Sequence, residues 1–389
     1  MNKLSKCLMI VAMLPLFLST ATAQTTVAEG VITTAVPFLR IIPDARSGAM
    51  GDVGIAMSPD ANSMFLNPSR LAFSEEDYGV GISYTPWLTN LKVNDIYMAA
   101  ASGFFKIDDQ QALGASVKYF NLGAITFTDE SGFTLGDFRP NEFAIDAHYA
   151  RKLSEVFGVA VSLRFIYSDL ASDFTAGGEQ IKKGTAGAGD ISLLYRKGIE
   201  LGEMNSKLNV GLNISNIGSK ITYTESAVKD FIPTNLGLGV GWELQVDEAN
   251  EIAIYTDFNK YLVPTPTTDD DDGNGVEDYK EKSPISAIFS SFGDAPGGFS
   301  EELKEITIGA GVEYWYDRLL AVRAGYFHEN AEKGNRKYMT VGLGVRYNVF
   351  GLDISYLVPT SSQNHPLDNT LRFTLVFNFN TETPEEIDN

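Results

Sequence analysis

The sequence predicts an all-β fold, a 14-stranded antiparallel transmembrane β-barrel with an N-terminal plug-like segment. Three observations lead to this prediction. Apolar and polar residues alternate along many runs of 11 to 14 residues, the links between successive runs are short and long in turn, and Tyr and Trp gather near the ends of the runs. Alternation alone also fits a soluble β-sandwich, so the lengths of the runs and the pattern of the links decide between the two architectures.

Residues 1–23 have the pattern of a secretory signal peptide. Lys3 and Lys6 give a positive start, an apolar run follows, and Ala21-Thr22-Ala23 offers a small-residue cleavage site. Cleavage changes the formal charge from −20 to −22 and removes Cys7, the only cysteine. We therefore expect a strongly acidic mature chain that has no disulfide or cysteine–metal site and does not bind nucleic acid.

Residues 24–74 do not alternate, and we expect turns and short helical pieces there. Proline and glycine recur through this segment, and Asn67-Pro68 should end any short helix that precedes it. A lumen of 14 strands is wider than the roughly eight-stranded barrel that side chains alone can fill. The segment has a suitable size to fold into that lumen as a plug.

The barrel itself is expected from residue 75 to residue 380. Its last run shows the alternation most clearly, with Leu371 and Phe373 on one face and Arg372 and Thr374 on the other. Most of the runs are longer than the usual 5–6 residues or so of a soluble strand and suit strands that cross a membrane at a tilt. The 14 candidate strands lie near 77–87, 93–106, 111–123, 139–152, 156–169, 187–197, 207–217, 232–245, 250–262, 304–316, 318–328, 336–348, 350–359 and 369–379.

The links between these strands sort by parity. Those after even-numbered strands are short, as at 107–110 and 246–249, whereas those after odd-numbered strands are mostly long, as at 124–138 and 263–303. Short periplasmic turns and long extracellular loops are typical of bacterial outer-membrane barrels, and a sandwich has no reason to sort its loops in this way. An even strand number predicts that both termini are periplasmic, including the acidic tail at 381–389.

The N-terminal segment also carries a family resemblance. The run Pro43-Asp44-Ala45-Arg46-Ser47-Gly48-Ala49-Met50-Gly51, followed by Asp60-Ala61-Asn62 and Asn67-Pro68, resembles the start of the FadL-like outer-membrane barrels. It looks most like the PorV (LptO) branch, which belongs to the type IX secretion system. The Asn-Pro element is shared with FadL-type transporters, whereas the longer run is more diagnostic of the PorV and PorQ group.

The resemblance implies a role in protein export. Such a protein would shuttle cargo, binding the C-terminal β-domain of secreted proteins and passing them from the large translocon barrel to a PorU-type attachment complex, within outer-membrane lipid. The alternative is a FadL-like transporter of hydrophobic small molecules. An enzyme is not expected, because the three histidines lie on separate strands or loops and no Ser or carboxylate spacing around them marks a catalytic triad. No cofactor is required by either function.

The loop at 263–303 contains a possible calcium site. Its acidic run fits the spacing of a calcium-binding loop, with oxygen ligands at odd positions, a glycine at the sixth and a glutamate at the twelfth. No helical pattern flanks the motif, and a solvated acidic loop is the simpler alternative. The predicted ligands are Asp270, Asp272, Asn274, Val276 through its carbonyl, and Glu281.

The same loop carries an apolar stretch that could contact a protein. Apolar residues in a surface loop suggest an interaction site, and cargo or the translocon would be natural partners. The alternative is that the segment folds over the barrel mouth and packs against itself. The candidate contact residues are Ile285, Ile288, Phe289, Phe292 and Phe299.

Overall fold

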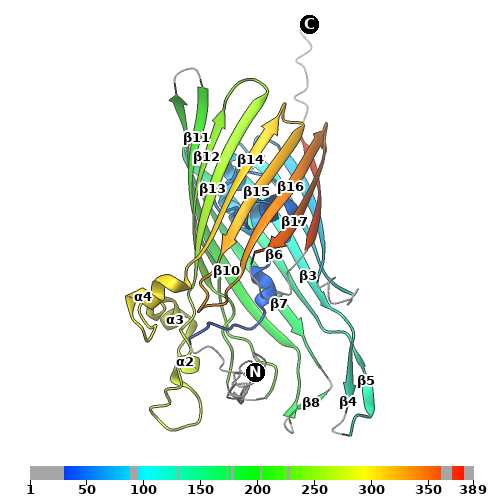
Figure 1. Cartoon of the computed structure of the whole chain (residues 1–389), viewed down its shortest axis with the longest axis vertical. Coiled ribbons are helices and arrows are strands. Elements are labelled where there is room, and N and C mark those ends of the chain that lie inside the picture. The colour runs from blue at the N-terminus through cyan, green and yellow to red at the C-terminus, as the bar shows by residue number, and fades with distance from the viewer. Residues whose placement is uncertain are drawn as a thin grey trace, which may run out of the picture.

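The protein is a closed β-barrel of 14 antiparallel strands, in which each strand pairs with its neighbours along the chain and the first pairs with the last (Figure 1). The computed structural model describes residues 30–87, 95–128, 131–172, 174–176, 179–201, 204–225, 228–360 and 370–380. The predicted signal peptide and the acidic tail lie outside these residues. The barrel strands are β1 (Tyr78–Pro86), β2 (Ile96–Asp108), β3 (Gln111–Leu122), β6 (Asn141–Ser154), β7 (Phe157–Asp169), β10 (Gly184–Leu201), β11 (Met204–Gly218), β12 (Asn235–Gln245), β13 (Asn250–Tyr261), β14 (Thr307–Tyr316), β15 (Leu320–His328), β16 (Lys337–Tyr347), β17 (Phe350–Pro359) and β18 (Leu371–Phe379).

Alternation along each strand separates an apolar outer face from a polar inner face. On β7, Val161, Leu163 and Phe165 point outward and are 54%, 75% and 48% exposed, whereas the alternating residues Ala160 and Ser162 are buried. The predicted 14-stranded antiparallel barrel is confirmed. The outer face is the surface that lipid covers in a barrel of this kind.

The two ends of the barrel differ. Short turns gather at one end, which we call the short-turn end, and Asn380 lies there after β18. Long connections gather at the opposite, long-loop end (Figure 1), where two small hairpins extend beyond the wall. These are β4 (Ile125–Thr128) with β5 (Thr134–Phe138), and β8 (Thr175–Ala176) with β9 (Glu179–Gln180).

The link between β13 and β14, residues 262–306, also lies at the long-loop end, and we call it the cap loop. It contains α2 (Asp278–Glu281), α3 (Pro284–Ser290), α4 (Phe299–Glu302) and the 3-10 turn η5 (Leu303–Glu305). Ser283 begins α3, since its hydroxyl accepts the N–H of Ser286 at 3.2 Å and proline follows at the first helical position. None of the helices among the described residues is long and apolar enough to cross a bilayer.

Residues 36–74, called the inner segment below, lie inside the barrel (Figure 1). They form η1 (Pro37–Arg40), α1 (Ala45–Gly48), η2 (Ser63–Phe65) and η3 (Pro68–Phe73). Their apolar side chains form clusters with inward-facing residues of the wall. Val36 and Phe38 join Met98 and Ile166 in one such cluster. The hydrophobic core of the protein is therefore the lumen itself.

The chain crosses the whole lumen before the first strand begins. Gly30 is at the long-loop end, where Lys333 Nζ donates to its carbonyl at 2.7 Å. Asp77 is at the short-turn end, where its N–H donates to the carbonyl of Phe379 at 3.1 Å. The predicted periplasmic position of both termini concerns residues outside the described ranges. The first and last described residues lie at opposite ends of the barrel. An even number of strands places the start of β1 and the end of β18 at the same end of the barrel. The inner segment precedes β1 and crosses the lumen to the opposite end.

Candidate functional site

One turn of helix, α1, brings the motif at residues 43–51 against the inner wall. Asp44 caps this turn by accepting the N–H of Ser47 at 2.8 Å, and burial raises the pKa of Asp44 to about 6. The chain then turns at Gly51, whose φ of +72° favours glycine. A Cβ at this position would lie 2.4 Å from the carbonyl oxygen of Tyr326 in β15, so the backbone of the motif rests directly on the wall.

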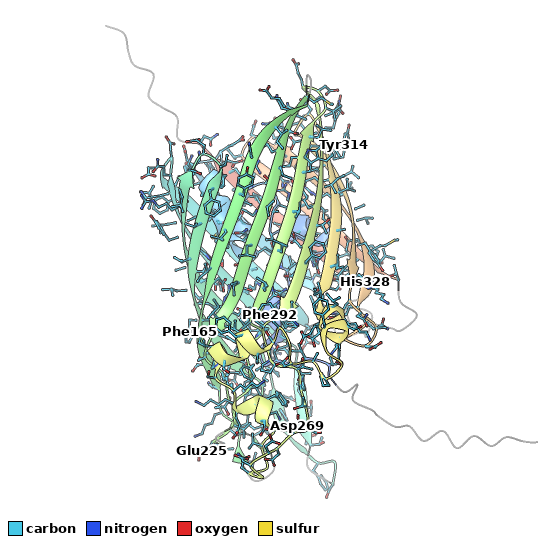
Figure 2. All side chains as sticks on the ribbon, turned by 90° about the vertical axis from the view of Figure 1, so that its left-hand side faces the viewer. Phe165, Glu225, Asp269, Phe292, Tyr314 and His328 are labelled. Atoms are coloured by element: carbon cyan, nitrogen blue, oxygen red, sulfur yellow. The ribbon has the colours of Figure 1, made fainter. Side chains whose placement is uncertain are left out.

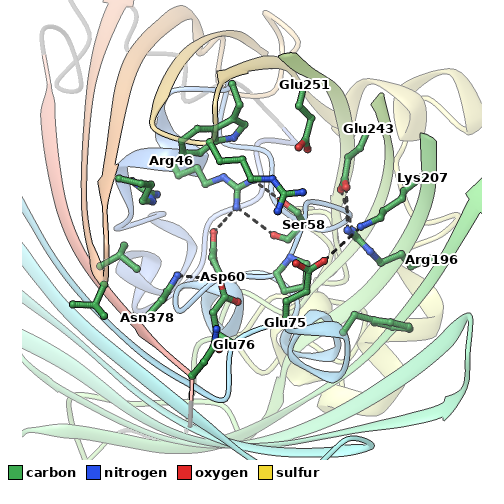
Figure 3. Close-up of a pocket in the computed structure, with 18 of the residues that line it drawn as sticks. Arg46, Ser58, Asp60, Glu75, Glu76, Arg196, Lys207, Glu243, Glu251 and Asn378 are labelled. Atoms are coloured by element: carbon green, nitrogen blue, oxygen red, sulfur yellow. Dashed lines mark hydrogen bonds and ion pairs between the residues drawn. The ribbon is translucent and has the colours of Figure 1, made fainter. Parts of the chain in front are cut away.

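Arg46 connects the motif to the wall through a buried group of charges, the lumenal ion cluster (Arg46, Asp60, Glu313, Arg323 and Asp353). Arg46 donates to both carboxylate oxygens of Glu313, at 2.7 and 3.0 Å. It also donates to Asp60 at 2.9 Å (Figure 3). Arg323 donates to Glu313 at 2.6 Å and to Asp353 at 2.7 Å. Buried charges are tolerated when they are paired and hydrogen-bonded as these are. The cluster therefore ties the inner segment to β14, β15 and β17.

Two further contacts fix the rest of the inner segment. Asp257 of β13 accepts the N–H of Gly54 at 2.7 Å, and Asn67 donates its side-chain amide to the carbonyl of Leu193 in β10 at 3.1 Å. Asn67 also accepts the N–H of Ser69 and so caps η3. Asn67-Pro68 thus both begins the helical turn η3 and attaches it to the wall.

Cavities lie at both ends of the barrel. One of about 600 Å³ opens at the short-turn end and is lined by charged residues, including Arg196 and Glu243, which pair at 3.0 Å (Figure 3). One of about 730 Å³ lies at the long-loop end, between residues 30–33 and the cap loop. Arg46 and Asp60 of the lumenal ion cluster line the cavity at the short-turn end, and the fully buried Met50 lies against the inner wall at Gly311 and Gly325.

The acidic part of the cap loop folds so that the predicted calcium ligands lie together. The side-chain amide of Asn274 donates to Asp272 and to Glu281, both at 2.9 Å, and its N–H donates to Asp270 at 3.1 Å. The N–H of Val276 donates to the side-chain oxygen of Asn274 at 2.7 Å. All five predicted ligands therefore belong to one hydrogen-bonded group, and calcium binding itself stays a prediction.

Asp278 is a residue of this group that the sequence analysis missed. Its carboxylate lies within 4.8 Å of those of Asp270 and Asp272. Counted from Asp270, it is the ninth position of the motif, where calcium loops often bind the ion through water, so the spacing could have identified it. We expected no helical pattern beside the motif, but α2 forms its last four positions and α3 begins three residues after it.

The predicted contact residues form an exposed apolar surface on α3 and α4. Four of the five are exposed, and Ile288 is half-buried. Leu303 of η5, which the sequence analysis did not single out, is also exposed. Ala287, on the buried face of α3, packs against Phe231 and Val263 at the barrel mouth. We call the exposed set, Ile285, Phe289, Phe292, Phe299 and Leu303, the cap surface.

Comparison with solved structures gives the same fold. The chain is similar to a mutant of the monoaromatic hydrocarbon channel TodX, with a TM-score of 0.50 and 10% identity over 87% of this chain and 98% of that one. The Pseudomonas putida toluene transporter TodX gives a TM-score of 0.49 and 11% identity over 86% of this chain and 98% of that one. A Pseudomonas aeruginosa FadL homologue gives a TM-score of 0.43 and 10% identity over 90% of this chain and 100% of that one. No curated protein sequence matches significantly.

A family comparison identifies the group within this fold. The sequence model of the type IX secretion system protein PorV matches residues 24–268, which is more than half of the 389 residues. The match includes the motif at residues 43–51, the inner segment and the wall up to the beginning of the cap loop. The chain therefore belongs to the family of the type IX secretion system protein PorV.

Proposed function

We propose that this protein is an outer-membrane shuttle of the type IX secretion system. It binds the C-terminal β-domain of exported cargo and passes the cargo from the large translocon barrel to a PorU-type attachment complex. The observation that carries the proposal, beyond family membership, is the occupied lumen. Buried ion pairs tie the inner segment to the wall inside the lumen. A barrel filled in this way is better suited to binding proteins at its surface than to letting proteins pass through it.

Cargo would dock at the long-loop end, which faces the cell exterior if the short turns are periplasmic as in other outer-membrane barrels. Support comes from the amount of structure at that end, where the hairpin β4–β5 extends beyond the wall and the cap loop lines a cavity of about 730 Å³. Phe133, at the tip of the hairpin, is 72% exposed.

The alternative function is transport of hydrophobic small molecules, which the FadL-like fold also permits. Such a molecule would need an apolar path through the lumen. The space near the long-loop end is filled by Val36, Phe38 and Leu39 of the inner segment, so transport would require this segment to move. Purification with a hydrophobic ligand in the lumen, and without any protein partner, would favour this alternative.

Co-purification from outer membranes tests the shuttle. We expect the protein to bring down large secreted proteins that carry the C-terminal β-domain, together with the attachment complex. Tyr279→Ala, in the wall of the long-loop cavity, should lower cargo recovery by roughly tenfold if this tyrosine is a contact of high energy. Tyr347→Ala is the control, because Tyr347 is exposed at the short-turn end. Isolation of the protein alone, under conditions that preserve secretion complexes, would contradict the shuttle.

We also propose that the acidic part of the cap loop binds Ca²⁺. Calorimetric titration of the mature protein should give a dissociation constant of about 10⁻⁴–10⁻³ M, the range of extracellular calcium modules. Asp272→Ala should abolish the binding heat, because Asp272 is a predicted ligand. Asp271→Ala removes the same charge from a neighbouring non-ligand position and should retain binding. Absence of heat in the unmodified protein, or an equal loss in both variants, would disprove the site.

A further inference from the structure

The cap surface has the pattern of an amphipathic helix whose apolar side faces outward. Ile285, Phe289 and Phe292 are four and three residues apart, so they share one face of α3 and its extension. Ala287 and Ser291, on the opposite face, are buried against the barrel mouth. The exposed fractions reach 76% for Phe289 and 75% for Phe299, the reverse of what a helix in water requires.

The two acidic side chains of α4 are directed away from this surface. Glu302 pairs with Lys260 at 2.7 Å, and Glu301 pairs with Lys333 at 2.6 Å. Lys333 comes from the link between β15 and β16. The acidic residues of α4 therefore bind the barrel, and the side chains left on the exposed face are apolar.

The partner of Glu302 shows where the cap loop lies relative to the wall. Lys260 follows Phe258 on the outer face of β13, because residues two apart on a strand point to the same side. Phe258 and its cross-strand neighbour Ile308 are exposed on the apolar outer face. Lys260 donates to both Glu302 and Glu305, so it fixes α4 and η5 at the end of β13, beyond the apolar belt of the wall.

The figures agree with this position. In Figure 1, α3 and α4 project sideways beyond the wall. In Figure 2, which views the barrel from that side, the same helices cross in front of its lower end. Phe292 is labelled there at nearly the same height as Phe165, an exposed residue of the outer face. The two views therefore place α3 and α4 on the outer side of the barrel mouth, beside the apolar outer face.

We propose that the cap surface inserts into the outer leaflet of the membrane and is a lipid-binding surface. The sequence analysis expected a protein contact for these residues, but their place at the rim favours acyl chains. An amphipathic helix buries its apolar face at the boundary between headgroups and acyl chains in this way. The proposal requires only that the barrel spans the outer membrane and does not depend on the shuttle function.

Site-directed spin labelling of the mature chain in vesicles tests the proposal, since Cys7 is the only cysteine and lies in the predicted signal peptide. Single-cysteine variants Phe289→Cys and Phe299→Cys are labelled with a nitroxide in phosphatidylcholine–phosphatidylglycerol vesicles. Collision rates are measured with oxygen, which concentrates in lipid, and with a water-soluble nickel chelate. Leu163→Cys, on the outer face of β7, is the lipid control, and Val276→Cys, in the acidic loop, is the water control.

We expect the labels at 289 and 299 to resemble the label at 163, with an oxygen-to-nickel collision ratio at least about fivefold above that at 276. Leu303→Cys should behave in the same way and provides an independent position. Ratios at 289 and 299 that match the water control would overturn the proposal. So would labels that are exposed to water in vesicles and become protected only when a secreted protein is added, because that result assigns the surface to protein docking.

Discussion

Replacing Glu313 by glutamine is expected to lower the free energy of unfolding by about 3–5 kcal/mol, the usual cost of breaking a buried ion pair from one side. The substitution keeps the size of the side chain and removes its charge. Glu313 accepts hydrogen bonds from both Arg46 and Arg323, so the change leaves two buried guanidinium groups facing a neutral amide. The inner segment should then loosen, and single barrels in planar bilayers should conduct ions that the unmodified protein excludes.

The matched control for Glu313→Gln is Glu225→Gln. Glu225 pairs with Lys182 on the surface, where the two side chains are 76% and 51% exposed. Exposed pairs contribute about 0–1 kcal/mol, so this variant should unfold in urea almost as the unmodified protein does. Equal urea midpoints and equal conductance for the two variants would show that the lumenal ion cluster does not hold the inner segment in place.

Gly325→Ala is expected to displace the motif from the wall. A Cβ at Gly325 in β15 would lie 2.1 Å from the carbonyl carbon of Met50 and 2.2 Å from the nitrogen of Gly51. Both are backbone atoms, so the inner segment has to move, at a cost of about 1–3 kcal/mol or more. Trypsin should then cut at Arg40 and Arg46, which are protected in the unmodified protein, and the released fragments are measured by mass spectrometry.

Gly187→Ala is the matched control for Gly325→Ala. Gly187 is on the exposed outer face of β10, and a Cβ there meets nothing within 4 Å. The same glycine-to-alanine change in a barrel strand should therefore leave the inner segment resistant to trypsin. Cleavage at similar rates in both variants would mean that strand glycines act on the wall rather than on its contact with the motif.

The sequence was sufficient to predict the wall and insufficient to predict what fills it. Alternation is local, so each strand could be read from its own residues, and the parity of the links then gave the barrel. Glu313 and Arg323 were recognisable as charges on the inner face. Their partner Arg46 could not be inferred, because it lies 267 residues from Glu313 and no local period relates the two.

Short elements outside the wall were missed for a different reason. The strands β4 and β5 have four and five residues, and α2 and α4 have four each, too few for a period to be visible. Aromatic stacking stabilises the β4–β5 hairpin, because the ring centroids of Phe127 in β4 and Phe174 lie 4.0 Å apart. A contact of this kind depends on the finished fold, so the residues alone did not indicate it.

The path of the inner segment also determines the order in which the protein is assembled. Residues 30–77 run from one mouth of the barrel to the other, and the strand that follows them pairs with β18 at the seam. If the seam closed first, the free amino end would have to be threaded through a finished cylinder. No threading is needed if the strands pair around the inner segment while the barrel is still open. Pairing of β1 with β18 then closes the barrel and encloses the inner segment in a single step.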